Sequence, residues 1–164
     1  MKNIALALTF IIGFSAFSQD RKIEFRHLTW AETLEASKTE NKPIFIDCYT
    51  TWCGPCKWMS ANIFTDNAVA DYFNENYIAV KFDMEKGEGL DLAKKFKIRA
   101  YPTLVHANAD EEILFISVGA NQDPKSYIAN AKQAMDPKNN LPYYLANKNE
   151  IFDEPKKMSG YFKV

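Results

Sequence analysis

Hydrophobic and polar residues alternate along the chain in short blocks that predict strands and helices in turn. Short apolar runs predict strands, and a capping residue followed by apolar positions three or four apart predicts a helix. The expected strands cover residues 23–28, 44–49, 77–82, 103–106 and 112–118, and the expected helices cover 29–40, 56–62, 68–75, 87–96 and 124–135. This alternation, closed by a hairpin and a last helix, indicates an α/β fold with a mixed sheet covered by helices on both faces.

Several expected elements carry capping or turn signals of their own. Thr29 and Glu32 have the spacing of a capping box, in which each side chain bonds to the backbone N–H of the other residue. Asp123 followed by Pro124 is a cap with a proline in the first helical turn, where a missing N–H does no harm. The polar residues 108–110 suit the turn of a hairpin between the last two strands.

The first eighteen residues have the pattern of a secretory signal. Lys2 gives a positive start, residues 4–14 are almost wholly apolar, and Ala16-Phe17-Ser18 places small residues at a cleavage site. We therefore expect cleavage after Ser18 and a periplasmic or secreted protein, with no stable membrane insertion afterwards. The alternative is an uncleaved anchor, although so short an apolar run is poorly suited to spanning a bilayer.

The rest of the chain is long enough for one domain with short extensions. We expect a signal peptide at 1–18, the domain at 19–136 and a C-terminal extension of unassigned role at 137–164. The extension is rich in asparagine, proline and lysine, so we expect it to be irregular. Its apolar side chains that can pack against the domain are Tyr143, Tyr144, Ile151 and Phe152.

Composition and charge exclude several classes of protein. The chain is 47% hydrophobic and 25% charged, which is typical of a globular protein and argues against a disordered one. The formal net charge is −1, so there is no electrostatic basis for binding nucleic acid or an anionic membrane surface.

The three cysteines, Cys48, Cys53 and Cys56, fall within nine residues and cannot join distant parts of a fold. Two structural alternatives remain beside redox chemistry. One is zinc, for which His27 and His106 are the only other soft ligands, without a second Cys-x-x-Cys or a paired histidine motif. The other is an inert bridge between Cys53 and Cys56, although so small a loop gains little stability from closure.

A pair of cysteines two residues apart, at the junction of a strand and a helix, suits thiol–disulfide exchange. The first sulfur meets unpaired backbone N–H groups and the positive end of the helix dipole, which favour the thiolate. Cys53 is therefore the candidate nucleophile, and Cys56, one turn further and more buried, is the candidate for attacking a mixed disulfide. Gly54 and Pro55 fit the tight turn and the first helical turn.

The run Trp52-Cys53-Gly54-Pro55-Cys56-Lys57 resembles the active-site signature of the thioredoxin family, and the resemblance extends from about Thr29 to Met135. The segment 64–69 is similar to the C-terminal periplasmic domain of membrane thiol–disulfide interchange proteins. The resemblance implies a thioredoxin fold with a central mixed sheet.

The resemblance also assigns roles outside the cysteine pair. Asp47, six residues before Cys53, matches a buried acid, and Lys81 matches its usual neighbour. Burial should raise the pKa of Asp47 and allow it to accept the Cys56 proton, unless Lys81 merely satisfies it.

The resemblance further implies a substrate surface. Tyr101-Pro102-Thr103 matches the loop whose proline is cis in the family and which faces the cysteines; an ordinary trans proline opening a strand is the alternative. Trp52 is expected to be exposed and to frame the docking surface, or else to be a core aromatic. Cys48 is expected on the opposite face of its strand as a small buried hydrophobe.

The expected reaction is dithiol–disulfide exchange with cysteines of other proteins through a mixed disulfide on Cys53. The Gly-Pro dipeptide resembles that of reducing family members, which implies a membrane electron donor to recharge the protein. No cofactor or metal is expected. The alternatives are a disulfide oxidase or isomerase and a redox-inactive adaptor that uses the same fold to bind partners.

Overall fold

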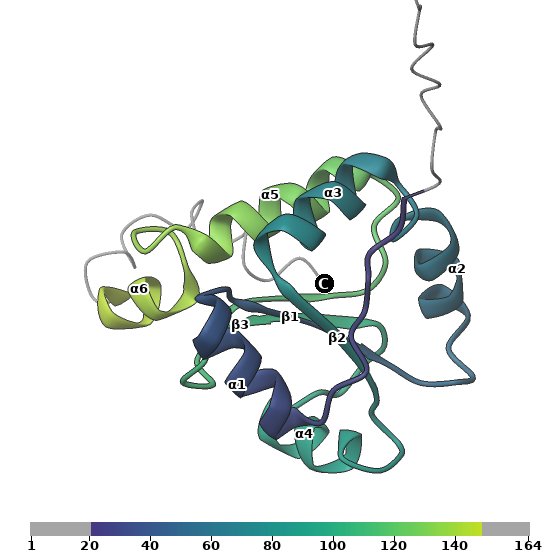
Figure 1. Ribbon diagram of the computed structural model, residues 1–164, viewed down its shortest axis with the longest axis horizontal. Helices are drawn as coiled ribbons and strands as arrows, with labels where there is room; N and C mark the ends of the chain where they lie inside the picture. Colours follow the sequence, from purple (N-terminus) through teal and green to yellow (C-terminus); the bar gives the residue numbers. More distant parts are fainter. Residues whose placement is uncertain (1–20, 149–164) are drawn as a thin grey trace, which may run out of the picture.

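The computed structural model describes residues 21–148, which fold around a four-stranded sheet (Figure 1). The expected signal at 1–18 with its cleavage point, and Ile151 and Phe152, lie outside the described residues. Within the described range no helix is both long enough and apolar enough to cross a membrane.

The sheet is mixed, as predicted. Its strands are β1 (Ile44–Tyr49), β2 (Ile78–Asp83), β3 (Thr103–Ala107) and β4 (Ile113–Val118), in the order β2-β1-β3-β4. The central strand β1 runs parallel to β2 and antiparallel to β3, and β3 and β4 form an antiparallel hairpin. The parallel pair needs a long crossover between its strands, which the two intervening helices provide.

Helices cover both faces of this sheet (Figure 1). On one face lie α1 (Trp30–Glu40) and α4 (Gly89–Lys95), and on the other lie α2 (Gly54–Asn62), α3 (Asn67–Asn76) and α5 (Pro124–Met135). A short helix α6 (Leu141–Ala146) follows α5 and contacts β4. This is a mixed four-stranded sheet with flanking helices, the thioredoxin fold that was expected.

Alternation along β1 divides the core into two parts. Phe45 packs with α3 and α5, whereas Ile44 and Ile46 pack against the side that holds α1 and α4. Successive side chains of a strand point to opposite faces. Asp47 therefore faces the α2 side with Phe45, and Cys48 faces the α1 side.

The predicted capping signals are confirmed. Thr29 and Glu32 form both hydrogen bonds of a capping box at the start of α1. Asp123 caps α5, with Pro124 as its first residue. These local bonds satisfy backbone N–H groups that have no partner inside the helix, which explains why both starts were predictable.

The expected first strand over 23–28 is wrong. The segment makes a single parallel bridge, between Arg26 and Val80. The Ile23 N–H bonds to the Phe64 carbonyl and the Glu24 N–H bonds to the Asn74 side chain. The backbone groups that a ladder would use are therefore taken by a loop and a helix.

The expectation that the chain is irregular after Pro137 is also wrong, because α6 forms there. Asn140 caps this helix and Pro142 lies in its first turn, where proline needs no N–H partner. The expected packing of Tyr144 is observed: it lies against the cluster of Phe115 and Ala134.

Candidate active site

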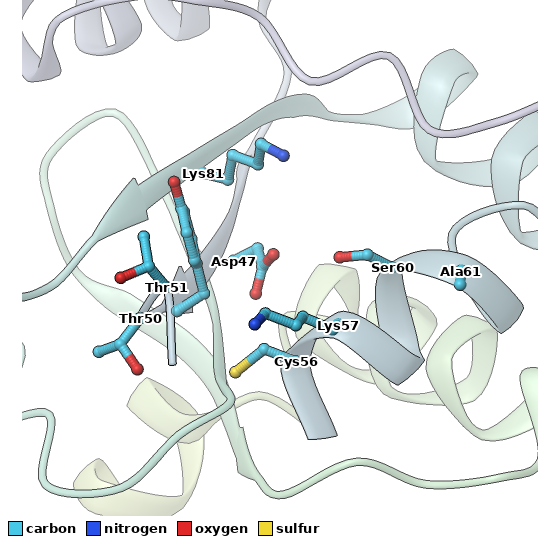
Figure 2. A pocket seen from close by; sticks show the side chains of 9 residues that line it. Asp47, Thr50, Thr51, Cys56, Lys57, Ser60, Ala61 and Lys81 are labelled. Atoms are coloured by element: carbon cyan, nitrogen blue, oxygen red, sulfur yellow. The ribbon is translucent and has the colours of Figure 1, made fainter. Parts of the chain in front are cut away.

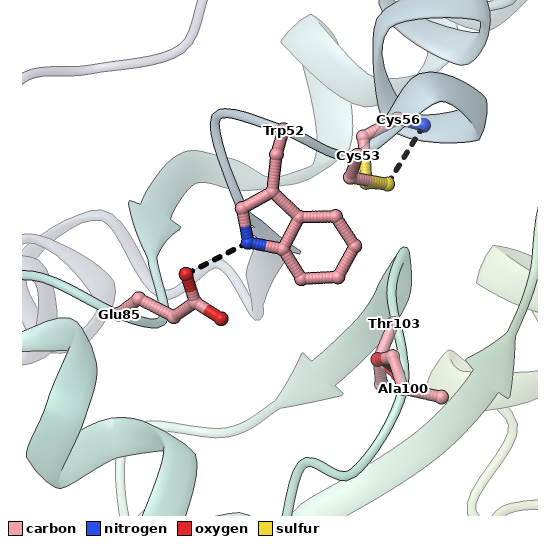
Figure 3. Close-up of a disulfide and its surroundings, with 6 residues drawn as sticks. All are labelled: Trp52, Cys53, Cys56, Glu85, Ala100 and Thr103. Carbon is pink, nitrogen blue, oxygen red and sulfur yellow. Dashed lines mark hydrogen bonds between the residues drawn. A yellow bond between two sulfur atoms is a disulfide. The ribbon is translucent and has the colours of Figure 1, made fainter.

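Cys53 and Cys56 form a disulfide at the start of α2, with an S–S distance of 2.03 Å (Figure 3). Cys53 is the N-cap of this helix, and its Sγ accepts a hydrogen bond from the Cys56 N–H at 3.1 Å. Gly54 and Pro55 are the first two residues of the helix. The helix start therefore presents a backbone donor to the sulfur that was expected to carry negative charge.

Both cysteines are buried in this oxidised form: Cys53 is 2% exposed and Cys56 is 3% exposed. The expectation that Cys56 is the more buried of the two does not hold in this oxidised form, because the exposed fractions of the two residues are nearly equal. A partner that attacks Cys53 has to reach into the site or displace the side chains around it.

Asp47 is 1% exposed, and its Oδ1 has no hydrogen-bond partner. Burial raises the pKa of Asp47 to about 7, an effect that the positive charge of Lys81 partly opposes. The two residues are paired in the β1–β2 register, yet no ion pair joins them among the described residues. Lys81 Nζ instead lies 5.7 Å and 5.6 Å from the ring centroids of Phe25 and Tyr49.

A cavity of about 470 Å³ brings Asp47, Lys81 and Cys56 together (Figure 2). Figure 2 shows the Asp47 carboxyl between Lys81 of β2 and helix α2, which contributes Cys56, Lys57 and Ser60. The remaining lining residues are Tyr49, Thr50, Thr51 and Ala61. The cavity thus joins the proposed acid to the second cysteine, and Cys53 is not among its lining residues.

The other predicted residues form a second group, beside Cys53. Trp52 is 65% exposed, so it is not a core aromatic, and its ring meets Tyr101 edge to face at 5.9 Å. The Tyr101–Pro102 peptide bond is cis, as the resemblance implied. The Pro102 carbonyl accepts the Gly119 N–H.

Two further predicted residues have local roles. The Thr103 hydroxyl donates to the Ala100 carbonyl at 2.8 Å, which braces the turn before β3. A Cβ added at Gly54 would meet nothing within 4 Å, so sterics alone do not require glycine there.

Three residues near the cysteines received no role from the sequence: Lys57, which belongs to the quoted signature, Ser60 and Glu85. Lys57 and Ser60 line the cavity with Cys56, and the spacing of Cys56 and Ser60 by four residues was the available signal, since it places both on one helix face. Glu85 accepts a hydrogen bond from the Trp52 indole N–H at 2.8 Å. No sequence pattern identifies Glu85, because it lies in the loop after β2.

Cys48 and His106 do not line this cavity, whereas His27 lines a neighbouring cavity that shares Ser60 and Lys81 with it. Cys48 is buried, and burial together with the Asp47 charge raises the pKa of its thiol. His106 is buried among Phe45, Phe73 and other aromatic rings. Within residues 21–148 no three His, Cys, Asp or Glu side chains gather as metal ligands would.

A family model described as Thioredox_DsbH, protein of unknown function DUF255, matches residues 17–101, just over half of the chain. The chain belongs to this thioredoxin-like family. The solution structure of a putative disulphide-isomerase from Bacteroides thetaiotaomicron is similar to it, with 43% identity and a TM-score of 0.65. That match covers 73% of this chain and 98% of the other.

Thioredoxins are also relatives of this thioredoxin-like chain. The thioredoxin of Echinococcus granulosus is 36% identical over 91 residues, which is 56% of this chain and 78% of the relative. Chloroplastic thioredoxin Y1 of Arabidopsis thaliana is 34% identical over 85 residues, 52% of this chain but only 46% of the relative. The chain therefore has a thioredoxin-like oxidoreductase fold with a Cys-x-x-Cys disulfide.

Proposed function

We propose that this protein is a thiol–disulfide oxidoreductase that exchanges electrons with cysteines of other proteins through a mixed disulfide on Cys53. The observation that carries the proposal is the Cys53–Cys56 disulfide at the start of α2, with the Cys56 N–H directed at Cys53 Sγ. In the reduced protein the same donor stabilises a thiolate on Cys53, and the thiolate is the form that attacks a disulfide.

The proposed cycle transfers two electrons. The Cys53 thiolate attacks one sulfur of a substrate disulfide, which forms the mixed disulfide and releases the other substrate sulfur as a thiolate. Cys56, once deprotonated, attacks Cys53 Sγ, which closes the Cys53–Cys56 disulfide and releases the second substrate thiolate. The substrate gains two electrons, its two thiolates take up one proton that left Cys56 and one from solvent, and the protein is oxidised.

Asp47 is the proposed base for the second step. Its pKa of about 7 suits a group that exchanges a proton near neutral pH. The cavity that Asp47 shares with Cys56 is large enough for water to carry the proton between them. Lys81 lines the same cavity and favours the ionised form of the acid.

The proposed docking surface consists of Trp52 and Gly54-Pro55 on the α2 side and Tyr101-Pro102-Thr103 on the sheet side. The contact between the Trp52 and Tyr101 rings supports it, since it joins the exposed α2 side to the partly exposed Tyr101, behind which Pro102 and Thr103 are buried. An extended substrate segment fits such a surface because its backbone can pair with the chain around Pro102.

We propose that electrons flow from this protein to its substrates, as the thioredoxin relatives suggest. The second candidate is a disulfide oxidase or isomerase, and the name of the Bacteroides relative favours the isomerase. Measuring the reduction potential separates the two directions of flow: a value near about −270 mV supports a reductant, and one near about −120 mV an oxidant.

The expected signal at 1–18 supports a periplasmic or secreted location, with the working domain at 19–136. An exported reductant needs a supply of electrons, so a membrane-bound electron donor is the proposed partner. The substrates are proposed to be proteins with disulfides.

An insulin disulfide-reduction assay tests the activity. We expect the wild type to be active, Cys53→Ser to be inactive, and Cys48→Ala to keep the wild-type rate, because Cys48 lies on the other side of β1. Equal rates for the wild type and Cys53→Ser would favour the redox-inactive adaptor.

A trapping experiment identifies the substrates. A Cys56→Ala variant cannot resolve the mixed disulfide, so it should capture substrates as mixed disulfides on Cys53.

A further inference from the structure

Trp52 is the most exposed large hydrophobic side chain among the described residues, and it directly precedes the buried Cys53. In Figure 3 the six-membered ring of its indole lies toward the disulfide, while the indole nitrogen points away toward Glu85. A substrate that reaches Cys53 therefore meets the Trp52 ring at the entrance.

The Trp52 ring is held at two points although it is exposed. Its Nε1–H donates to Glu85 Oε2 at 2.8 Å, and its face or edge meets Tyr101 at an interplanar angle of 80°. Glu85 belongs to the loop after β2, and Tyr101 to the loop before β3. The Trp52 ring thus contacts two separate loops, one after β2 and one before β3.

Glu85 is itself fixed by the end of β2. Its N–H donates to Asp83 Oδ1 at 3.1 Å, and the next residue, Lys86, donates its N–H to the Asp83 carbonyl at 3.0 Å. The Met84 N–H donates to the Tyr49 carbonyl at 2.9 Å, which ties the loop to the end of β1. The acceptor of the Trp52 hydrogen bond is therefore connected to the central strands through backbone bonds.

We propose that Glu85 is a positioning residue of this site: it fixes the Trp52 ring against Tyr101 and so prepares the surface on which a substrate polypeptide docks beside Cys53. The kinetic consequence rests on the proposed function. A side chain that is already ordered loses less conformational freedom when a partner binds, so the effect belongs to docking and not to the sulfur chemistry.

Two substitutions separate orientation from charge. Glu85→Ala removes both the hydrogen-bond acceptor and the negative charge, whereas Glu85→Gln removes the charge and keeps an acceptor of the same length. Asp91→Ala is the matched control, since Asp91 is an exposed acid on α4 that pairs only with Lys94 among the described residues. If Glu85 acts by orienting Trp52, the Trp52 indole signal and the KM of Glu85→Gln stay close to those of the wild type, whereas those of Glu85→Ala change.

Nuclear magnetic resonance of the oxidised protein tests the positioning without any activity. The chain has three tryptophans and so three indole N–H signals, and Trp52→Phe identifies the relevant one. We expect Glu85→Ala to move the Trp52 signal and speed its exchange with solvent, while the Trp30 and Trp58 signals stay in place. An unchanged Trp52 signal in Glu85→Ala overturns the proposal.

Insulin-reduction kinetics test the consequence. We expect Glu85→Ala to raise KM by about two- to ten-fold with little change in kcat, the cost of ordering one side chain on binding. In a Trp52→Phe background Glu85→Ala should have no further effect, because it acts through Trp52. If the KM increases of Trp52→Phe and Glu85→Ala multiply in the double variant, the proposal is overturned. Equal KM increases for Glu85→Gln and Glu85→Ala overturn it as well. A wild type without insulin activity instead refutes the proposed function, and the indole signals still decide the positioning.

Discussion

Asp47 and His106 are buried ionisable side chains that respond to pH in opposite directions. Burial raises the pKa of Asp47 to about 7 and lowers the pKa of His106 to about 3. In both cases the low-polarity surroundings disfavour the charged form. The folded protein is therefore destabilised by charge on Asp47 at high pH and by charge on His106 at low pH.

Asp47→Asn should stabilise the protein increasingly as pH rises. A carboxyl whose pKa is higher in the folded than in the unfolded chain loses stability as pH rises from about 4 through about 7. The difference in the free energy of unfolding between variant and wild type should grow by on the order of 4 kcal/mol between pH 4 and pH 8. Urea unfolding of the oxidised proteins measures it, and a difference independent of pH would contradict the raised pKa.

His106→Leu should show the opposite trend. The folded protein binds a proton on His106 only near pH 3, whereas the unfolded chain binds one below about 6.5, so stability falls as pH drops through this range. Relative to the wild type, the variant should gain about 2 to 3 kcal/mol between pH 7.5 and pH 4.5. The same unfolding experiment checks this, and parallel pH profiles for both proteins would refute it.

At the scale of residues, the sequence was informative where chemistry depends on neighbours in the chain. Cys53 and Cys56 could be assigned from their spacing and from the helix that follows. Asp47 and Lys81 required the family resemblance, because the strand pairing that brings them together is not a local property. Glu85 had no signal, since its contact with Trp52 joins residues 33 positions apart in the chain.

At the scale of elements, the junction of β2 and α4 is packed without room for a side chain. A Cβ added at Gly89, the first residue of α4, would lie 1.9 Å from the Asp83 carbonyl oxygen. That oxygen belongs to backbone and cannot rotate away. The close approach fixes the loop that carries Glu85.

Gly89→Ala should therefore destabilise the protein by about 1 to 3 kcal/mol or more, the usual cost of overpacking. Chemical unfolding measures the loss, and Gly54→Ala is the matched control, because a Cβ there meets nothing within 4 Å. Similar stability for Gly89→Ala and the wild type would mean that the junction can widen. In that case the Trp52 indole signal should shift as well.

The accuracy of the predicted elements depended on local signals. Capped helices such as α1 and the buried strand β1 were predicted within a residue or two. The segment 23–28 has a strand-like composition, but tertiary contacts took its hydrogen bonds. The asparagine, proline and lysine content of the extension predicted irregular chain, yet Pro142 lies in the first turn of α6, where proline needs no N–H partner.

At the scale of the whole molecule, the proposed direction of electron flow is a statement about stability. A protein that readily gives up electrons is one whose folded state favours the disulfide over the two thiols. We expect the oxidised protein to be more stable to urea than the reduced protein by about 2 kcal/mol, a small gain for a disulfide because the closed loop has only four residues. A reduced form more stable than the oxidised form would indicate an oxidant.

The class of the fold followed from alternating strands and helices, whereas its topology did not. Nothing local in the sequence states that β3 inserts beside β1, giving the order β2-β1-β3-β4. The family resemblance implied a thioredoxin fold with a central mixed sheet, without stating the strand order. Pairings between distant strands depend on packing across the whole core, which a single sequence does not display.

The side chains of Asp47 and Cys48 point to opposite faces of β1, and this determines how many of the three cysteines can take part in the proposed exchange. Cys48 packs with Ile46 and Val80 under α1, and the sheet stands between it and the sulfurs at the start of α2. If the proposed function holds, a third thiol so enclosed cannot reach the Cys53–Cys56 disulfide, and we expect repeated turnover to leave the disulfide pairing unchanged. The proposed reaction would then transfer two electrons through two of the three cysteines, while Cys48 remains a thiol in both redox states.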